Sequence, residues 1–396
     1  MKNQISNQLP IDTRHIKIQD QLTTFPEHLY QLADTLEILD LSGNQLTTLP
    51  DDLTRFTKLR ILFASNNPFT QLPPVLGRMP QLEMVGFKAC QIHDVPADSL
   101  PPQLRWLILT DNQIHLLPNT LGQRPRLQKL MLACNQLSSL PASLSQCTSL
   151  ELLRISGNRF TEVPDGVCQL PALAWLAIAG NPLTQKSELQ SLTTKALEAI
   201  SHQDLQVCQL LGEGASGHVY QAIHNSDGRA LALKVFKAGQ TSDGTPQSEL
   251  AAGLAAGQHP HLLTPLAPVL GQPDGKLAMA LPLLSDGLQP LAGPPSFDSC
   301  TRDVYAPDTY FERSAATRML AGIRSALVHL HERGILHGDL YAHNILWNPS
   351  TGDAVLSDLG AAALLHDLPA TQKAQLLQLE LRALRHLEQE VQARMR

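Results

Sequence analysis

Leucines recur along the first half of the chain at intervals of 22 or 23 residues. The regularly spaced segments open at Leu36, Leu59, Leu82, Leu104, Leu127, Leu150 and Leu173. The first of them, residues 36–46, fits the pattern LxxLxLxxNxL. Each segment predicts a short strand followed by a return segment, with the leucines pointing inward. Since no single repeat could bury its core alone, we expect the repeats to stack on one another.

A polar column follows eight residues after the opening leucines. It reads Asn44, Asn67, Cys90, Asn112, Asn135, Asn158 and Asn181. Where the chain turns away from a strand, a side-chain amide can pair backbone groups of adjacent turns. Most segments then reach an apolar residue followed by proline, as in Leu49-Pro50. This half resembles the leucine-rich repeat family, which accepts cysteine in that column. The resemblance implies an α/β solenoid of about seven to eight repeats over residues 12–184.

Two columns of strand residues are expected to face outward on the concave side of this solenoid. The apolar members that we expect to bind a protein partner are Ile61, Phe63, Met84, Trp106, Ile108, Met131, Leu152 and Trp175. A soluble protein seldom displays so much contiguous apolar surface unless something covers it. Tryptophan and methionine are also enriched in the cores of interfaces. Packing of these columns against the rest of the chain is the competing interpretation.

Residues 185–203 are predicted to form a capping helix or linker, and residues 204–396 a second domain. The second domain begins with a GxGxxGxV pattern at Gly212, Gly214, Gly217 and Val219. A turn at residues 225–228 and an apolar run at residues 230–236 follow. That order is strand, turn, strand, which argues against a dinucleotide-binding turn, because such a turn leads directly into a helix.

Lys234 lies in the middle of this apolar run, 17 residues after Gly217. A buried lysine is costly unless it is paired. Glu249, in the next predicted helix, is the expected partner; a solvent-facing glutamate is the alternative. Further along, residues 337–346 read HGDLYAHNIL, and Asp358 follows 14 residues after Asn344 within a DLG sequence.

These four motifs, in this order and at these spacings, resemble the protein kinases. The resemblance implies an α+β domain of two lobes, residues 204–284 and a truncated C-lobe at 285–396, that uses ATP and Mg²⁺. It implies ATP binding by Leu211, Gly212, Gly214, Gly217, Val219 and Lys234, with Glu249 fixing Lys234. Asp339 would orient the acceptor hydroxyl and take its proton, and Asn344 and Asp358 would be the metal ligands.

The sequence departs from the kinase pattern at several positions. Gly338 replaces an arginine of the catalytic loop, and Tyr341 stands where serine/threonine kinases have a lysine. His343 is the candidate to compensate, although an ordinary surface histidine fits equally well; His337 is expected to support the loop rather than act as a base. Glu380, in the last predicted helix, is expected to replace the acidic residue that supports the catalytic loop in the family.

A proline-rich segment, residues 289–310, precedes the helix predicted over residues 311–333. We expect this segment to cover part of the nucleotide or acceptor site, because long loops in compact domains are often functional. A disordered insertion is the alternative.

Composition narrows the possible functions. Lys plus Arg number 30 and Asp plus Glu number 36, so the net charge is −6 and nucleic-acid binding is not expected. No apolar run is long enough to span a membrane, and residues 1–8 do not resemble a secretory signal. The six cysteines lack metal-ligand spacing. These features predict a cytoplasmic protein without a metal cluster or disulfide framework.

The leading hypothesis is a soluble, minimal protein kinase, with serine or threonine favoured weakly as acceptor, whose repeats bind a protein partner or substrate. A bacterial cytosolic kinase of this architecture is the type it resembles. A small-molecule phosphotransferase is one alternative, since the shortened C-lobe suits it. A pseudokinase scaffold that acts through its repeats is the other.

Overall fold

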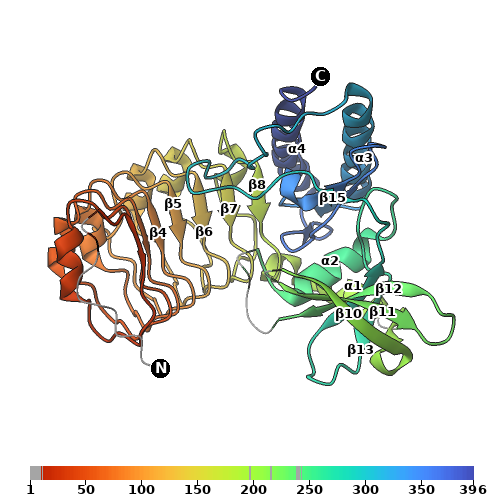
Figure 1. Ribbon diagram of the computed structural model, residues 1–396, viewed down its shortest axis with the longest axis horizontal. Coiled ribbons are helices and arrows are strands. Elements are labelled where there is room, and N and C mark those ends of the chain that lie inside the picture. Colours follow the sequence, from red (N-terminus) through yellow and green to blue (C-terminus); the bar gives the residue numbers. More distant parts are fainter. Residues whose placement is uncertain (1–9, 11, 196–197, 215, 238–240, 242) are drawn as a thin grey trace. The chain divides into compact units, whose positions relative to one another are not determined.

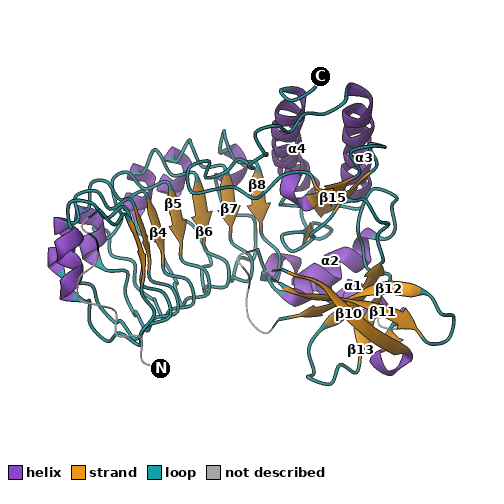
Figure 2. Ribbon diagram, viewed as in Figure 1, coloured by secondary structure: helices purple, strands orange, loops and turns teal. Residues whose placement is uncertain are grey.

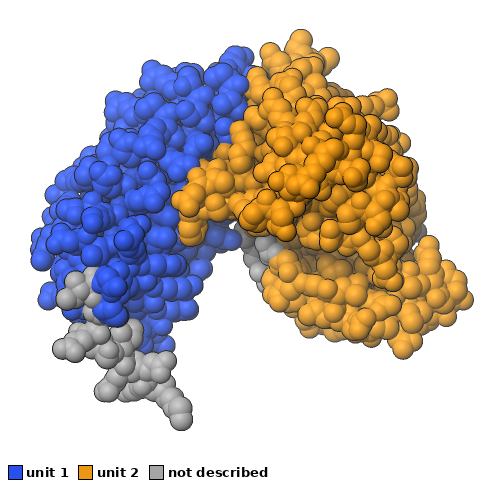
Figure 3. All heavy atoms as spheres, turned by 45° about the horizontal axis from the view of Figure 1, so that its top comes forward, with its two compact units in different colours: residues 1–151, 164–172 blue, residues 152–163, 173–396 orange. Residues whose placement is uncertain are grey.

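The computed structural model describes residues 10, 12–195, 198–214, 216–237, 241 and 243–396. These form two compact units (Figure 3). The first holds the chain up to residue 151 together with residues 164–172, and the second holds residues 152–163 together with 173–396. Residues 1–8, for which the absence of a secretory signal is predicted, lie outside the described residues.

The first unit is built from short parallel strands. They are β1 (His15–Lys17), β2 (Ile38–Asp40), β3 (Ile61–Phe63), β4 (Met84–Gly86), β5 (Trp106–Ile108) and β6 (Lys129–Met131). Each pairs with the next, so that corresponding repeat positions lie in register. The return segments carry short 3₁₀ helices: η1 (Glu27–Leu32), η2 (Asp51–Arg55), η3 (Pro74–Arg78), η4 (Asn119–Gln123), η5 (Ala142–Gln146) and η6 (Val167–Gln169). In Figure 2 these helical turns lie away from the row of strands.

Buried leucines and an asparagine ladder stabilise this unit. The opening leucines Leu36, Leu59, Leu82, Leu104 and Leu127 are all buried. The Asn67 amide donates to the carbonyls of Leu41 at 2.9 Å and Ala64 at 3.0 Å, and its oxygen accepts from the Leu46 N–H at 2.9 Å. At Cys90, which interrupts the column, the thiol contacts the Ala64 and Lys88 carbonyls, each at 3.6 Å. The ladder thus pairs backbone groups that would otherwise be buried unsatisfied.

The second unit begins with the last two repeat strands, β7 (Leu152–Arg154) and β8 (Trp175–Ala177), which pair in parallel. Helix α1 (Pro182–Lys195) follows β8 and overlaps residues 185–203, the segment expected to cap the repeats; residues 196–197 of that segment lie outside the described residues. A short strand, β9 (Ile200–Ser201), and the 3₁₀ helix η8 (His202–Asp204) lead into a mixed sheet.

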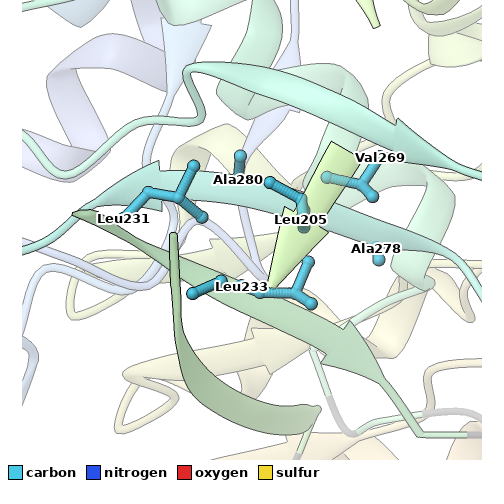
Figure 4. Close-up of a cluster of buried hydrophobic side chains, with 7 residues drawn as sticks. Leu205, Leu231, Leu233, Val269, Ala278 and Ala280 are labelled. Carbon is cyan, nitrogen blue, oxygen red and sulfur yellow. The ribbon is translucent and has the colours of Figure 1, made fainter. Parts of the chain in front are cut away.

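This sheet has the order β10-β11-β12-β14-β13-β9. Its long strands are β10 (Leu205–Glu213), β11 (Gly217–His224), β12 (Ala230–Phe236), β13 (Ala267–Leu270) and β14 (Ala278–Pro282). One face buries the cluster of Leu205, Leu231, Leu233, Val269 and Ala280 (Figure 4). Because side chains alternate along a strand, Ala232 points to the other face. There it clusters with Phe236 and with Leu250 and Leu254 of helix α2 (Pro246–Ala256).

The rest of the second unit is mainly helical. Helix α3 (Arg313–Glu332) contacts α4 (Ala370–Gln392), and the two lie side by side in Figure 1. Both correspond to helices predicted from the sequence. A small sheet of order β15-β17-β18 comprises β15 (Gln289–Pro290), β17 (Ile345–Trp347) and β18 (Ala354–Leu356), and β16 (Ile335–Leu336) pairs with β19 (Ala363–Leu364). None of the described helices is both long and apolar enough to cross a membrane.

Candidate active site

A cavity of about 210 Å³ lies in the second unit, between the β10–β11 turn, helix α2 and residues 358–360. Gly214, Gly217, Val219 and Lys234 line it, as the sequence predicts. The other two residues expected to bind nucleotide, Leu211 and Gly212, lie on β10 outside the lining, and Leu211 is 46% exposed. Leu281 and Leu359, the second residue of the DLG sequence, also line the cavity. The sequence analysis assigned no role to four further residues of the walls, which are Asp243, Leu263, Pro265 and Met279.

Lys234 on β12 forms an ion pair with Glu249 on α2 inside this cavity. The two side chains are only 12% and 5% exposed. Burial raises the pKa of Glu249; the nearby Lys234 charge opposes this increase, and Asp358 adds to it. The start of α2 is fixed by Thr245, whose hydroxyl accepts from the Ser248 N–H at 3.2 Å. The structure thus brings together the predicted lysine–glutamate pair.

The catalytic-loop residues Asp339 and Asn344 are joined by hydrogen bonds. The Asn344 amide donates to Asp339 Oδ2 at 2.8 Å and to the Asp339 carbonyl at 2.9 Å. Asn344 is connected in turn to the DLG segment, because its carbonyl accepts from the Ser357 N–H at 2.9 Å. Asp358 has a positive φ of 59° and lines the cavity, and its Oδ1 accepts from the Gly360 N–H at 3.0 Å. These contacts place Asn344 beside Asp339 and connect Asn344 to the segment that holds Asp358, which lines the cavity.

Two buried residues, Glu380 and His337, make hydrogen-bond contacts that support the catalytic loop. The Glu380 carboxylate accepts from the Gly338 N–H at 2.6 Å and contacts His331 Nε2 at 2.7 Å. His337 is buried, and its Nε2 lies 3.1 Å from the Ser357 carbonyl. The structure therefore places Glu380 and His337 where the sequence analysis expects supporting residues.

Arg154, on the repeat strand β7, also contacts the loop. Its Nη2 contacts Asp339 Oδ1, its Nη1 donates to the Gly338 carbonyl at 2.9 Å, and its Nε lies 2.9 Å from Asp243 Oδ1. The sequence analysis missed this role. The only available signal was an arginine in an otherwise largely apolar outward column, and nothing in the local sequence points to a partner 185 residues away.

Trp175, on the repeat strand β8, packs against the same loop. Its Nε1 donates to the Leu340 carbonyl at 3.0 Å, and its ring stacks on Tyr341 with centroids 4.2 Å apart. Trp175 is only 2% exposed, and Leu152 is also buried. The prediction that Trp175 displays a partner-binding surface is therefore corrected: its ring is covered by the catalytic loop, as in the competing interpretation.

His343 faces Asp303, in the proline-rich segment before α3. Its Nδ1 lies 2.7 Å from Asp303 Oδ1, and its backbone N–H donates to Oδ2 at 2.9 Å. Burial lowers the pKa of His343, but the hydrogen bond and charge of Asp303 outweigh this effect and raise the pKa above its ordinary value. Leu291, in the same segment, donates to the Ile345 carbonyl at 2.9 Å. This segment therefore packs on the catalytic loop, and it is not a disordered insertion.

The donor set fits a hard cation such as Mg²⁺. Asp358 and Asn344 offer carboxylate and amide oxygens, which Mg²⁺ prefers. Among the described residues, no group of three or more His, Cys, Asp or Glu side chains could hold a metal alone. The remaining ligands would therefore come from phosphate oxygens and water, as is usual for Mg²⁺ bound with a nucleotide.

Comparisons with known proteins place these features in families. Residues 205–377 match the protein kinase domain, and residues 35–56, 102–160 and 125–183 match leucine-rich repeats. The chain is 31% identical over 168 residues to the mitogen-activated protein kinase kinase kinase bck1 of Aspergillus fumigatus, covering 40% of this chain and 10% of that protein. It is 30% identical over 167 residues to the serine/threonine-protein kinase PknF of Mycobacterium tuberculosis, covering 41% and 33%.

Both matches span only a tenth to a third of these relatives. A solved leucine-rich-repeat protein from Leptospira interrogans shares 24% identity, covers 46% of this chain and 58% of its own, and has a TM-score of 0.28. The family matches therefore identify leucine-rich repeats within residues 35–183, followed by a protein kinase domain at residues 205–377.

Proposed function

We propose that this chain is an ATP- and Mg²⁺-dependent protein kinase that transfers a phosphoryl group to a protein hydroxyl, with serine or threonine as the favoured acceptor. The observation that carries the proposal is the Lys234–Glu249 ion pair in a cavity that Asp358 also lines. A buried cation held by a carboxylate is suited to bind phosphate. The kinase-named relatives support the choice of protein acceptors.

In this proposal the nucleotide lies in the cavity under the β10–β11 turn. Lys234 binds the α- and β-phosphates, and Glu249 keeps its ammonium group in place. Mg·ATP would supply the transferable γ-phosphoryl group, and its Mg²⁺ would neutralise part of the phosphate charge. Asn344 and Asp358 would hold the metal. Gly217 gives the turn its close approach to β12, because a Cβ there would lie 2.6 Å from the Val235 carbonyl oxygen.

Asp339 orients the acceptor hydroxyl and receives its proton. As the acceptor oxygen bonds to the γ-phosphorus, the bond from that phosphorus to the ADP oxygen breaks, and the hydroxyl proton passes to the Asp339 carboxylate. Asn344 fixes that carboxylate through the hydrogen bond to Oδ2. Catalysis then comes mainly from positioning and charge stabilisation.

An acceptor panel tests the proposal. Mg·ATP labelled in the γ-phosphate is offered with protein acceptors and, separately, with a set of hydroxylated metabolites. Label on serine or threonine of the proteins is the expected result. Label on metabolites alone would assign the chain to the small-molecule phosphotransferases. Nucleotide binding without any transfer would favour the pseudokinase scaffold.

The repeats are proposed to select the protein acceptor. In the first unit, Phe63, Trp106, Ile108 and Met131 are partly exposed outward residues, whereas Ile61 and Met84 are buried. Lys129 Nζ lies 4.3 Å from the Trp106 ring centroid, which adds a cation to the apolar face. Trp106→Ala should remove label from particular proteins of an extract while labelling of a generic acceptor stays unchanged. Equal loss on all acceptors would contradict a selecting role.

A further inference from the structure

The guanidinium of Arg154 connects the catalytic loop to the nucleotide cavity. It contacts the Asp339 carboxylate, the Gly338 carbonyl and Asp243, which lines the cavity. All four residues belong to the second compact unit. The Arg154 side chain is only 3% exposed. A buried arginine with two carboxylate partners is strongly held, because losing either partner would leave charge uncompensated in a desolvated place.

The catalytic loop itself supplies no cation at this place. Tyr341 occupies the position where the kinase resemblance expects a lysine, and its ring is buried against Trp175. His343 is directed to Asp303. In the described part of the chain, the arginine or lysine in contact with the Asp339 carboxylate is Arg154, which comes from a repeat.

The contact with Arg154 leaves the Asp339 carboxylate able to accept a further hydrogen bond. Arg154 binds Oδ1 and Asn344 binds Oδ2. Each carboxylate oxygen has two lone-pair sites, so either can still accept from an acceptor hydroxyl. Together the two contacts fix the orientation of the Asp339 carboxylate.

The last repeat strand, β8, packs closely against the catalytic loop. Gly338 has a φ of 75°, and a Cβ there would lie 2.5 Å from the Leu176 carbonyl oxygen of β8. Trp175 stacks on the loop, and Arg382 of α4 donates to the Leu173 carbonyl at 2.8 Å. Releasing Arg154 from the catalytic loop would require separating all these contacts. We therefore interpret Arg154 as a permanent part of the site and not as an inhibitory contact that can be removed.

We propose that Arg154 is a positioning residue for phosphoryl transfer, supplied by the repeat region, which holds the Asp339 carboxylate aligned in place of a loop lysine. This inference rests on the proposed kinase function. It makes the last repeats part of the catalytic machinery, in addition to any role in binding partners.

The test compares full-length wild type with Arg154→Gln, Arg154→Lys and the control Arg126→Ala, which removes an exposed arginine of an earlier repeat. Arg154→Gln should lower kcat by about 10- to 100-fold, because misplacing a reacting group by about 1 Å costs about that much. The KM for Mg·ATP should change by less than about twofold, because uniform substrate binding is untouched. A purely structural role would reduce the fraction of folded enzyme, and kcat per folded molecule would stay unchanged.

Arg154→Lys keeps the charge but loses the forked donor geometry, so kcat should recover only part of the loss. If Arg154→Gln fails to fold, the lysine variant decides alone: its kcat should still lie below wild type, and a kcat equal to wild type would overturn the inference. In a folded Arg154→Gln, an unchanged or raised kcat would also overturn it, the latter identifying Arg154 as an inhibitory contact. An inactive wild type would overturn the proposed function itself, and this inference with it.

Discussion

The Glu380 carboxylate accepts a hydrogen bond from the backbone N–H of Gly338 at 2.6 Å. This contact joins the last helix, α4, to the residue that precedes Asp339. Glu380 is almost completely buried and also contacts His331. The position of the catalytic loop therefore depends on a carboxylate 42 residues further along the chain.

Replacing Glu380 with alanine should lower the free energy of unfolding by about 2–4 kcal/mol, because it leaves a buried N–H and a partly buried histidine without their partner. Glu388→Ala, on the same helix, is the control. Glu388, whose side chain is 18% exposed, pairs with the half-exposed Arg324, so its loss should cost less than about 1 kcal/mol. Urea denaturation of both variants makes the comparison, and equal losses would contradict a supporting role for Glu380.

Gly338→Ala should destabilise the protein by about 2–5 kcal/mol. The new Cβ would lie 2.5 Å from the Leu176 carbonyl oxygen and 2.7 Å from that of Ala361, at a φ of 75°. The cost combines about 1–2 kcal/mol for the left-handed conformation with about 1–3 kcal/mol for overpacking. Gly228→Ala has a similar φ of 70° and open space around its Cβ, so it should show the conformational cost alone. A similar decrease of Tm in both variants would contradict close packing of β8 against the catalytic loop.

The His343–Asp303 pair should make stability depend on pH. Because the folded-state pKa of His343 is raised, the pair's contribution is complete below the unfolded value of about 6.5 and is lost as the pH rises through the folded pKa. The loss of stability caused by His343→Gln should therefore be larger at pH 6 than at pH 9. The charges that sustain the shift are those of Asp303, Asp339 and Asp358. Asp303→Asn should abolish most of the pH dependence; a dependence that survives in this variant would assign it to another group.

Asn67→Ala should cost about 2–4 kcal/mol, because it leaves one buried N–H and two buried carbonyls without their side-chain partner. Asn119→Ala serves as the control, since Asn119 is exposed at the start of η4 and its replacement should change stability by less than about 0.5 kcal/mol. A small effect at Asn67 would mean that the ladder does not stabilise the repeats.

The sequence predicts the repeat strands well because their period is local. Each of the strands β2 to β8 begins two residues after its opening leucine. The Lys234–Glu249 pair could also be predicted, because only 15 residues separate the two side chains. Asp358 lines the same cavity from much further along the chain, and only the resemblance to the protein kinases predicted it. For Leu211 and Gly212 the motif holds, but the structure places them outside the cavity lining.

Long-range contacts could not be predicted in this way. Arg154 meets Asp339, and Trp175 meets Tyr341, across well over a hundred residues of chain, and no spacing rule connects them. In the sequence, Gly338 stands out only because an arginine is missing there, whereas the structure places the Leu176 carbonyl against it. The sequence likewise offers His343 as a candidate to contact phosphate, whereas the structure pairs it with Asp303.

Phosphate transfer tests the proposed kinase function most directly. Wild type, Lys234→Ala, Asp339→Asn and the control Lys276→Ala, which removes a surface lysine paired with Asp274, are incubated with labelled Mg·ATP and a protein acceptor. We expect transfer by wild type and Lys276→Ala, and a decrease of at least about 100-fold in the transfer rate of the other two variants. Transfer by Asp339→Asn at the wild-type rate would contradict the proposed function.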